Sequence, residues 1–324
     1  MDKLQAIKEP IVAEFEEFKT LFFASLQSEN PLLNEVLTHI KQRTGKMLRP
    51  ILTLLIAKGL GNVSNAAYHG AIALELLHNA SLLHDDVVDE SDERRGQPSV
   101  NAIYGNKVSV LAGDYIMAHS LNHSALTNST QIVQIIAGLG DNLATGEIVQ
   151  LANVDSNSYD ESIYFEVIRK KTAALFSSCA AVGAISAGAG KEMIKQAYNF
   201  GDLVGIAFQI KDDIFDYYSS LSIGKPTGND MREGKLTLPS LYVLNTLKDE
   251  ALINIARRIR SFQASDSEIA HFIEAVKKNG GIEYAEKVMR EYRDKAMKMI
   301  ESLVPASIRD AIACYIDFVI ERDK

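Results

Sequence analysis

Apolar residues recur at the three- and four-residue spacing of a helix along almost the whole chain, and strand-like alternation is nearly absent. Residues that start or end helices separate the periodic segments. They are Asn30-Pro31, Ser158 with Glu161, Ser265 with Glu268, Asn279-Gly280-Gly281 and Pro305. No linker, low-complexity tract or short-period repeat divides the chain. The sequence therefore predicts an all-α fold in a single domain over residues 1–324.

The composition argues against several classes of protein. There are 42 acidic and 34 basic residues, whereas nucleic-acid binding needs a surplus of Lys and Arg. A hydrophobic fraction of 47% is typical of a globular chain with a sizeable core. The N-terminus alternates charged and apolar residues, which predicts no signal peptide. The uncharged run 172–190 is mostly Ala, Ser and Gly, so we expect a tightly packed central helix there and no transmembrane segment.

Two aspartate-rich clusters carry most of the chemical information. The motif D-D-x-x-D occurs as Asp85, Asp86 and Asp89 and again as Asp212, Asp213 and Asp216. At about 100° per residue, each set lies on one helix face. A lone acidic cluster is more often a solvated helix end, but these two follow strongly apolar stretches, and in a shared cleft they would repel each other without cations between them. Carboxylates without His or Cys spacing select magnesium, which shares phosphate oxygens readily, so we predict Mg²⁺ and a diphosphate substrate.

Basic residues near presumed loops and helix ends supply positive charge for such a substrate. Singly, each is more often a solvated surface charge than a ligand. The set comprises Lys46 and Arg49 in GKMLRP, Arg94 and Arg95 after the first cluster, Lys171 beside Thr172, and also Lys225 and Lys235. Together with the two acidic clusters, these cations predict a pocket for diphosphate groups.

Five ordered segments between about residues 45 and 240 resemble the landmarks of the trans-isoprenyl diphosphate synthase family. The segments are GKMLRP, LLHDDVVDESDERRG, RKKTAALF, GIAFQIKDDIFDY and GKPTGNDMREGKLTLP. Five motifs in family order are a specific signal, whereas one D-D-x-x-D would be weak. The resemblance implies a helical bundle of the isoprenoid synthase type with a central apolar cavity.

The resemblance also implies a role for each matching residue. Asp85, Asp89 and Asp212 would bind magnesium, and Asp86, Asp213 and Asp216 would complete or orient its coordination shells. The allylic diphosphate would be bound by Arg94, Lys171, Lys225 and Lys235. The diphosphate of isopentenyl diphosphate would be bound by Lys46, Arg49, His78 and Arg95. Thr172 and Gln209 would lie beside the reacting carbons, where an oxygen dipole stabilises positive charge.

The implied reaction is a head-to-tail condensation of isopentenyl diphosphate onto farnesyl or geranylgeranyl diphosphate. The small residues Ala80 and Ser81 stand five and four positions before the first motif, where short-chain members of the family carry bulky aromatic residues. We therefore expect an all-trans product of medium to long chain, from hexaprenyl to nonaprenyl, such as octaprenyl diphosphate. Met117 is a candidate floor of the product tunnel, although an ordinary core role for it is the more common one. A geranylgeranyl product is the alternative.

Other activities on the same fold remain as alternatives. A terpene cyclase would be expected to carry a different second metal motif and no GKxxRP segment, and a head-to-head synthase would usually end in a membrane tail. A non-catalytic subunit or scaffold would show degenerate aspartates, whereas all six are intact. The resemblance further implies a homodimer in the cytoplasm, with transient membrane contact for product release.

Overall fold

The structure is a computed structural model that describes the chain except residues 1–2, 43–44, 95, 155–158, 219–226 and 321–324. The chain divides into two compact units, which are described separately. The first unit comprises Met1–Asp141, Leu175–Asp202 and Met297–Phe318. The second unit comprises Asn142–Ala174, Leu203–Ala296 and Val319–Lys324. That all 324 residues form a single domain stays a prediction.

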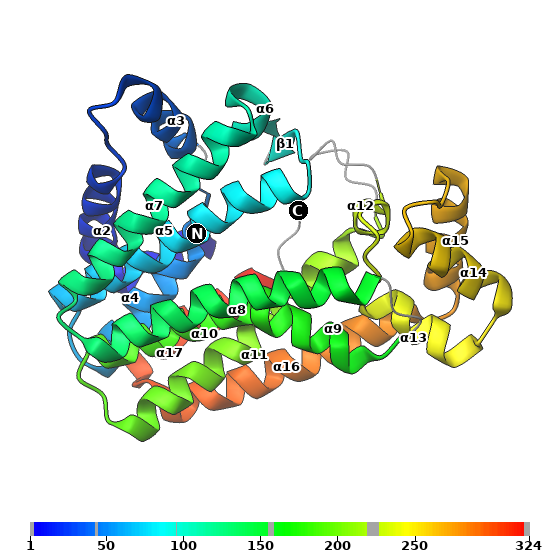
Figure 1. The fold of residues 1–324 in the computed structure, drawn as a ribbon. Coiled ribbons are helices and arrows are strands. Elements are labelled where there is room, and N and C mark those ends of the chain that lie inside the picture. Colours follow the sequence, from blue (N-terminus) through cyan, green and yellow to red (C-terminus); the bar gives the residue numbers. More distant parts are fainter. Residues whose placement is uncertain (1–2, 43–44, 95, 155–158, 219–226, 321–324) are drawn as a thin grey trace. The chain divides into compact units, whose positions relative to one another are not determined.

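The described residues are almost entirely helical, as predicted (Figure 1). In chain order the elements are α1 (Lys3–Lys8), the 3₁₀ turn η1 (Glu9–Ile11), α2 (Val12–Ser25), α3 (Pro31–Lys41), α4 (Leu48–Leu60), α5 (Asn65–Val88), β1 (Glu93–Arg94), β2 (Gln97–Pro98), α6 (Val100–Tyr104), α7 (Asn106–Leu126), α8 (Thr130–Val154), α9 (Glu161–Ile168), the π-helical turn η2 (Arg169–Ala173), α10 (Ala174–Ser186), α11 (Lys191–Phe215), α12 (Asn229–Arg232), α13 (Leu238–Leu247), α14 (Glu250–Arg260), α15 (Asp266–Lys278), α16 (Gly281–Leu303) and α17 (Ala306–Ile320). The two short strands pair antiparallel as a hairpin after α5.

Within the first unit, α5 and α7 run side by side at close range (Figure 1). Two buried serines of α7 help to join the helices: Ser120 Oγ donates to the Ala73 carbonyl oxygen at 2.7 Å, and Ser109 Oγ donates to that of Leu83 at 3.2 Å. A serine hydroxyl can bond a neighbouring helix only where the backbones approach closely, so the small residues of α7 set this spacing. The packing of α7 against α5 determines the rotation of α5 about its axis, and with it the orientation of the first aspartate motif at the end of α5.

The run of small residues at 172–190, predicted to form a tightly packed helix, is largely helical and buried. Residues 173–184 are buried, and α10 forms most of the run. A Cβ added at Gly183 would come within 2.5 Å of the Thr53 carbonyl oxygen, which shows how closely α10 and α4 approach. Small side chains, and not apolarity alone, allow this contact.

Most of the predicted helix ends are confirmed. The Asn30 side chain accepts the Leu33 N–H before α3, and Ser265 and Glu268 form a capping box at the start of α15. Asn279 and Gly280 separate α15 from α16, and Pro305 precedes α17. The start of α9 differs from the prediction: its cap is Asp160, whose side chain accepts a hydrogen bond from the Ser162 N–H. Ser158, the residue predicted for that role, lies outside the described residues.

One helix in the described part of the chain could cross a membrane by length and composition, and it is not the segment that the sequence singled out. It covers Thr130–Ala152 within α8, with a mean hydropathy of 1.2 over 18 residues, of which 22% are buried. A single helix of this kind is weak evidence for a membrane span, since apolar core helices meet the same criteria.

Candidate functional site

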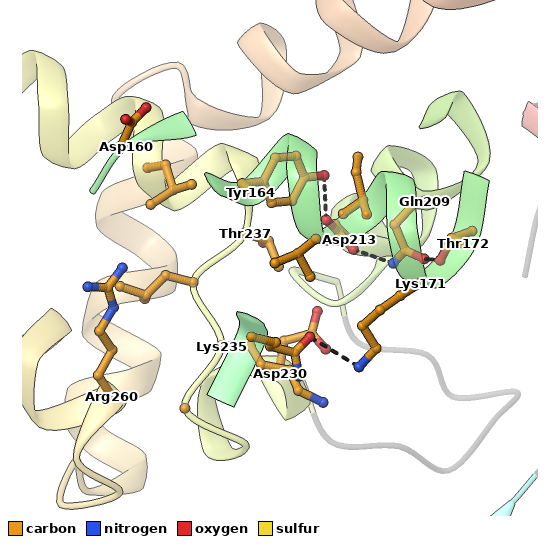
Figure 2. Close-up of a pocket in the computed structure, with 16 residues that line it drawn as sticks. Asp160, Tyr164, Lys171, Thr172, Gln209, Asp213, Asp230, Lys235, Thr237 and Arg260 are labelled. Carbon is orange, nitrogen blue, oxygen red and sulfur yellow. Dashed lines mark hydrogen bonds between the residues drawn. The ribbon is translucent and has the colours of Figure 1, made fainter. Parts of the chain in front are cut away.

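The second unit contains a cavity of about 230 Å³ whose wall combines acidic, basic and amide side chains (Figure 2). Its charged and polar lining includes Lys171, Thr172, Gln209, Asp213, Asp230 and Lys235. Five of these six were predicted as site residues from the sequence, and Asp230 was not. Asp213 of the second aspartate motif and the two lysines therefore meet at one cavity.

Asp213 is the most buried acid of the second motif, with 3% of its surface exposed. Tyr164 Oη donates to its Oδ2 at 2.7 Å, and Gln209 Nε2 donates to its Oδ1 at 2.7 Å (Figure 2). Burial raises the pKa of Asp213 to about 7, although both hydrogen bonds lower it, and the negative charges of Asp212 and Asp216 raise it further. Its two oxygens are therefore oriented by neutral donors of the protein.

Asp216, one residue beyond the end of α11, has a different role. Its Oδ1 accepts the backbone N–H of Asn229 at 2.9 Å, and its Oδ2 accepts that of Asp230 at 3.1 Å. These bonds hold the start of α12, where Gly228 precedes the helix at a φ of 79° that favours glycine. Burial raises the pKa of Asp216, and the two backbone hydrogen bonds lower it.

Asp230 adds a carboxylate that lies outside both D-D-x-x-D motifs. It is half-buried and lines the cavity. Its pKa is raised well above the ordinary value, first by burial and then by the charges of Asp216 and Asp213. The segment GNDMREGK was recognised in the sequence, but no local pattern indicated that this particular acid faces the cavity.

Lys171 and Thr172 lie on η2, a π-helical turn in an otherwise α-helical run. Such turns are rare, and those that occur often lie at functional sites. Lys171 Nζ forms an ion pair with Glu147 and donates to Gln150 Oε1 at 3.2 Å, both on α8. Thr172 Oγ1 donates to Gln209 Oε1 at 2.6 Å. Neither Glu147 nor Gln150 was predicted, although a carboxylate and a carboxamide one turn apart on an apolar helix are a usable signal.

Lys235, like Lys171, is positioned by a glutamate side chain. Its Nζ donates to Glu233 Oε2 at 2.6 Å, and the other oxygen of Glu233 accepts from Asn229 Nδ2 at 2.6 Å. The Lys235 backbone N–H donates to the Asp230 carbonyl oxygen at 2.8 Å. The loop that carries the lysine is thus tied to the start of α12.

The first aspartate motif lies at the end of α5, in the first unit. Asp86 is 2% exposed, and its Oδ1 accepts from Arg94 Nε at 2.6 Å. The two residues line a small cavity of about 40 Å³. Asp85 is half-buried, and Asp89 is exposed at the helix end, where its N–H donates to the Asp85 carbonyl oxygen. Arg94 therefore bonds to the motif itself, and its contact with a diphosphate stays a prediction.

The predicted isopentenyl-binding residues of the first unit lie on or near α4 and α5. Lys46 Nζ lies 4.8 Å from the centre of the Phe318 ring, and the Arg49 guanidinium lies 5.5 Å from that of Phe176. His78 is buried on α5.

The residues proposed to set chain length follow on α5: Ala80 is fully buried, and Ser81 is half-buried with its Oγ donating to the His78 carbonyl oxygen at 2.9 Å. Met117, the candidate floor, is half-buried on α7.

Two predicted site residues, Arg95 and Lys225, lie outside the described residues. That the two aspartate motifs face one cavity also stays a prediction, because each belongs to a different unit.

The acids of the second motif suit a cation that needs few protein ligands. Among the described residues, no group of three or more His, Cys, Asp or Glu side chains is placed to hold a metal ion alone. The available donors are carboxylate oxygens of Asp213, Asp216 and Asp230, whose pKa values are raised first by burial and further by neighbouring negative charges. A divalent cation that keeps its own waters and shares phosphate oxygens fits this donor set.

Comparison with known proteins gives a consistent result over the whole chain. The family model described as polyprenyl synthetase matches residues 30–276. The octaprenyl diphosphate synthase of Haemophilus influenzae is 35% identical over 316 residues, 96% of this chain and 94% of that protein. The crystal structure of geranylgeranyl pyrophosphate synthase from Bacteroides thetaiotaomicron is 48% identical, with a TM-score of 0.88 over 99% of this chain and 100% of that one.

A third similar protein was crystallised with ligands. The polyprenyl synthase of Caulobacter crescentus, solved in complex with calcium and isoprenyl diphosphate, is 30% identical, with a TM-score of 0.92 over 99% of this chain and 98% of that one. Use of a divalent metal is a property of the family. The motif order, the all-α fold and these matches agree, and the chain belongs to the polyprenyl synthetase family of prenyltransferases, the trans-polyprenyl diphosphate synthases.

Proposed function

We propose that this prenyltransferase condenses isopentenyl diphosphate head-to-tail onto farnesyl or geranylgeranyl diphosphate and releases a medium- or long-chain all-trans polyprenyl diphosphate. The observation that carries the proposal is the cavity of the second unit, where Lys171 and Lys235 line the same wall as Asp213 and Asp230. Cations beside carboxylates suit a diphosphate that arrives with a divalent metal ion.

Magnesium is the metal we propose, with Asp85, Asp89 and Asp212 as its direct ligands. Bound there, it would act as a Lewis acid that stabilises charge on the departing diphosphate. Asp86, Asp213 and Asp216 would orient the site, which is supported by the hydrogen bonds that engage each of them.

The lysines and arginines would bind the two diphosphates. Lys171 and Lys235, with Arg94 and Lys225, would neutralise charge on the allylic diphosphate as its C–O bond breaks. Lys171 and Lys235 are each held by a glutamate, so little side-chain entropy remains to be lost when substrate binds. Lys46, Arg49, His78 and Arg95 would hold isopentenyl diphosphate.

The oxygens of Thr172 and Gln209 would lie beside the allylic carbons. Ionisation leaves positive charge on those carbons, which an oriented hydroxyl or carbonyl dipole stabilises. The isopentenyl double bond adds to this cation, and the released diphosphate is the base that we propose takes the proton. An apolar enclosure keeps out water, which would otherwise trap the cation.

An octaprenyl product is our proposal for chain length. Ala80 carries only a methyl group, whereas a bulky aromatic residue at this buried position of α5 would block a chain that grows past it. The similarity to the octaprenyl synthase of H. influenzae supports this length, and the similarity to the geranylgeranyl synthase of B. thetaiotaomicron supports the shorter alternative.

We also propose a homodimer in the cytoplasm, and the exposed surface of the first unit supports the dimer. On α7, Leu111 and Leu121 are 66% and 56% exposed, and the side chain of Ala118 is also exposed between them. Burial of these leucines against a second copy would be favourable, with the exposed Asp114 lying on the same helix face. We further propose that release of the apolar product involves transient contact with a membrane.

Incubation with radiolabelled isopentenyl diphosphate, magnesium and either farnesyl or geranylgeranyl diphosphate tests the function. We expect elongated diphosphates in both cases and an octaprenyl chain as the longest main product by chromatography. A geranylgeranyl main product from farnesyl diphosphate would support the short-chain alternative. Absence of turnover by the magnesium-loaded protein would contradict the proposal and favour a non-catalytic subunit.

A further inference from the structure

Four side chains of the second unit form a continuous hydrogen-bonded chain in the cavity wall (Figure 2). Thr172 Oγ1 donates to Gln209 Oε1 at 2.6 Å, Gln209 Nε2 donates to Asp213 Oδ1 at 2.7 Å, and Tyr164 Oη donates to Asp213 Oδ2 at 2.7 Å. All four residues line the cavity. Tyr164 is the one member of the chain for which the sequence indicated no role.

The acid at the centre of the chain sets the direction of every bond. When Asp213 is ionised, its carboxylate can only accept hydrogen bonds, so Gln209 presents its NH₂ group to Asp213. The carbonyl oxygen of Gln209 then points to Thr172, whose hydroxyl donates to it. If the amide were turned around, its NH₂ group would face the cavity beside Thr172, and two acceptors would meet at Asp213.

Tyr164 holds the end of this chain that lies away from Thr172. Its side chain is 7% exposed and projects from α9, and its ring packs edge-on against Phe165 with the ring centres 5.3 Å apart. A buried phenol has few rotamers, so its hydroxyl is a fixed donor. It bonds the oxygen of Asp213 that Gln209 does not use, and thereby fixes the plane of the carboxylate.

We propose that Tyr164 is a positioning residue: through Asp213 it keeps the Gln209 carbonyl oxygen directed toward Thr172 and the cavity. This inference rests on the proposed function, in which that oxygen stabilises the allylic cation. In this arrangement Asp213 orients Gln209, and the metal is bound by other acids of the two motifs. Loss of the tyrosine hydroxyl should impair the chemical step and leave substrate and metal binding unchanged.

The test is Tyr164→Phe, which removes the hydroxyl and keeps the ring. We expect kcat to fall roughly tenfold, the size of one hydrogen bond to a charged group. The KM values of both diphosphates and the half-saturating magnesium concentration should stay within about twofold of the parent. Tyr284→Phe is the matched control, because that hydroxyl donates to Glu161 at 2.8 Å and Tyr284 is not among the cavity-lining residues.

A double-mutant cycle with Gln209→Ala separates this route from others. If Tyr164 acts through Gln209, Tyr164→Phe should cause little further loss of kcat in the Gln209→Ala background. Equal loss in both backgrounds, a near-parental kcat, or a raised magnesium requirement would each overturn the proposal. Circular dichroism and thermal unfolding of each variant show whether it is folded, and Asp213→Asn repeats the cycle if Tyr164→Phe is not. An inactive parent protein would instead contradict the proposed function.

Discussion

The three acids of the second motif have the same side chain but different surroundings. Asp213 accepts bonds from a phenol and an amide, and Asp216 accepts two backbone N–H groups at the start of α12. Asp212 is half-buried on the last turn of α11. We propose that Asp213 and Asp216, whose oxygens accept protein hydrogen bonds, orient the site, and that Asp212 binds the metal directly, as the family resemblance implies.

Substitution of the assigned metal ligands should abolish activity and spare the fold. For Asp85→Ala and Asp212→Ala we expect turnover to fall roughly a thousandfold, because each removes an oxygen ligand of the ion that stabilises the departing diphosphate. Asp141→Ala, at an exposed position of α8, is the control and should retain parental turnover. Helicity by circular dichroism should be the same in all three. Near-parental activity of either variant would refute the assignment for that cluster.

At the scale of the elements, small residues determine how closely the helices of the first unit approach. Ser109 and Ser120 bond α7 to α5, and Gly183 allows α10 to lie against α4. In the second unit, the π-helical turn η2 places Lys171 and Thr172 on the cavity wall. Local backbone geometry thus sets which side chains reach the site.

A methyl group at Gly183 should destabilise the protein. The added Cβ of Gly183→Ala would lie 2.5 Å from the Thr53 carbonyl oxygen, so α4 and α10 must move apart. We expect a loss of about 1–3 kcal/mol in the free energy of unfolding. Gly138→Ala on α8 has no atom within 4 Å of the added Cβ and should be neutral or stabilising by up to about 1 kcal/mol. Equal effects of the two substitutions in urea unfolding would contradict this interpretation.

A bulky residue on α5 should shorten the product. Ala80 is fully buried, and Ala80→Phe adds a ring below the first aspartate motif, where we propose that the chain grows. The longest product should lose at least one isoprene unit, as measured by chromatography of the hydrolysed products. Ala13→Phe, the same change at an exposed site of α2, should leave the product unchanged. An unaltered product from Ala80→Phe would place the limiting wall elsewhere.

At the scale of the whole molecule, the exposed leucines of α7 are a feature that a lone protomer does not explain. The residues Leu111, Ala118 and Leu121 are exposed on a helix whose opposite face packs in the first unit. A patch of this kind is characteristic of a surface that another protein covers. A second copy is the partner that we propose.

Charge placed on that face should dissociate the dimer. We expect light scattering to give the parent twice the mass of a 35.7-kDa chain, and Leu111→Asp with Leu121→Asp to give the mass of one chain. Burial of two further carboxylates beside Asp114 in an interface is strongly unfavourable. Val12→Asp, at an exposed apolar site of α2, should leave the mass unchanged. A monomeric parent protein would rule out the proposed dimer.

The sequence by itself determined the helices and the reactive residue types. Helical periodicity and capping residues act within a few positions of one another, so Asn30, Ser265 and the stop at Asn279-Gly280 could be read directly and are confirmed. The aspartate motifs were equally visible, because a helix places residues three and four positions apart on one face.

Only the tertiary structure decided which partners these residues have. Tyr164 meets Asp213 across 49 positions, and Lys171 reaches Gln150 across 21. Such pairs depend on how helices pack, and nothing in the local pattern of either segment predicts them. For the same reason, the sequence did not indicate that Asp216 binds the backbone at the start of α12 or that Asp230 lines the cavity. Local chemistry is encoded locally, whereas the environment that gives each identical carboxylate its role arises from packing.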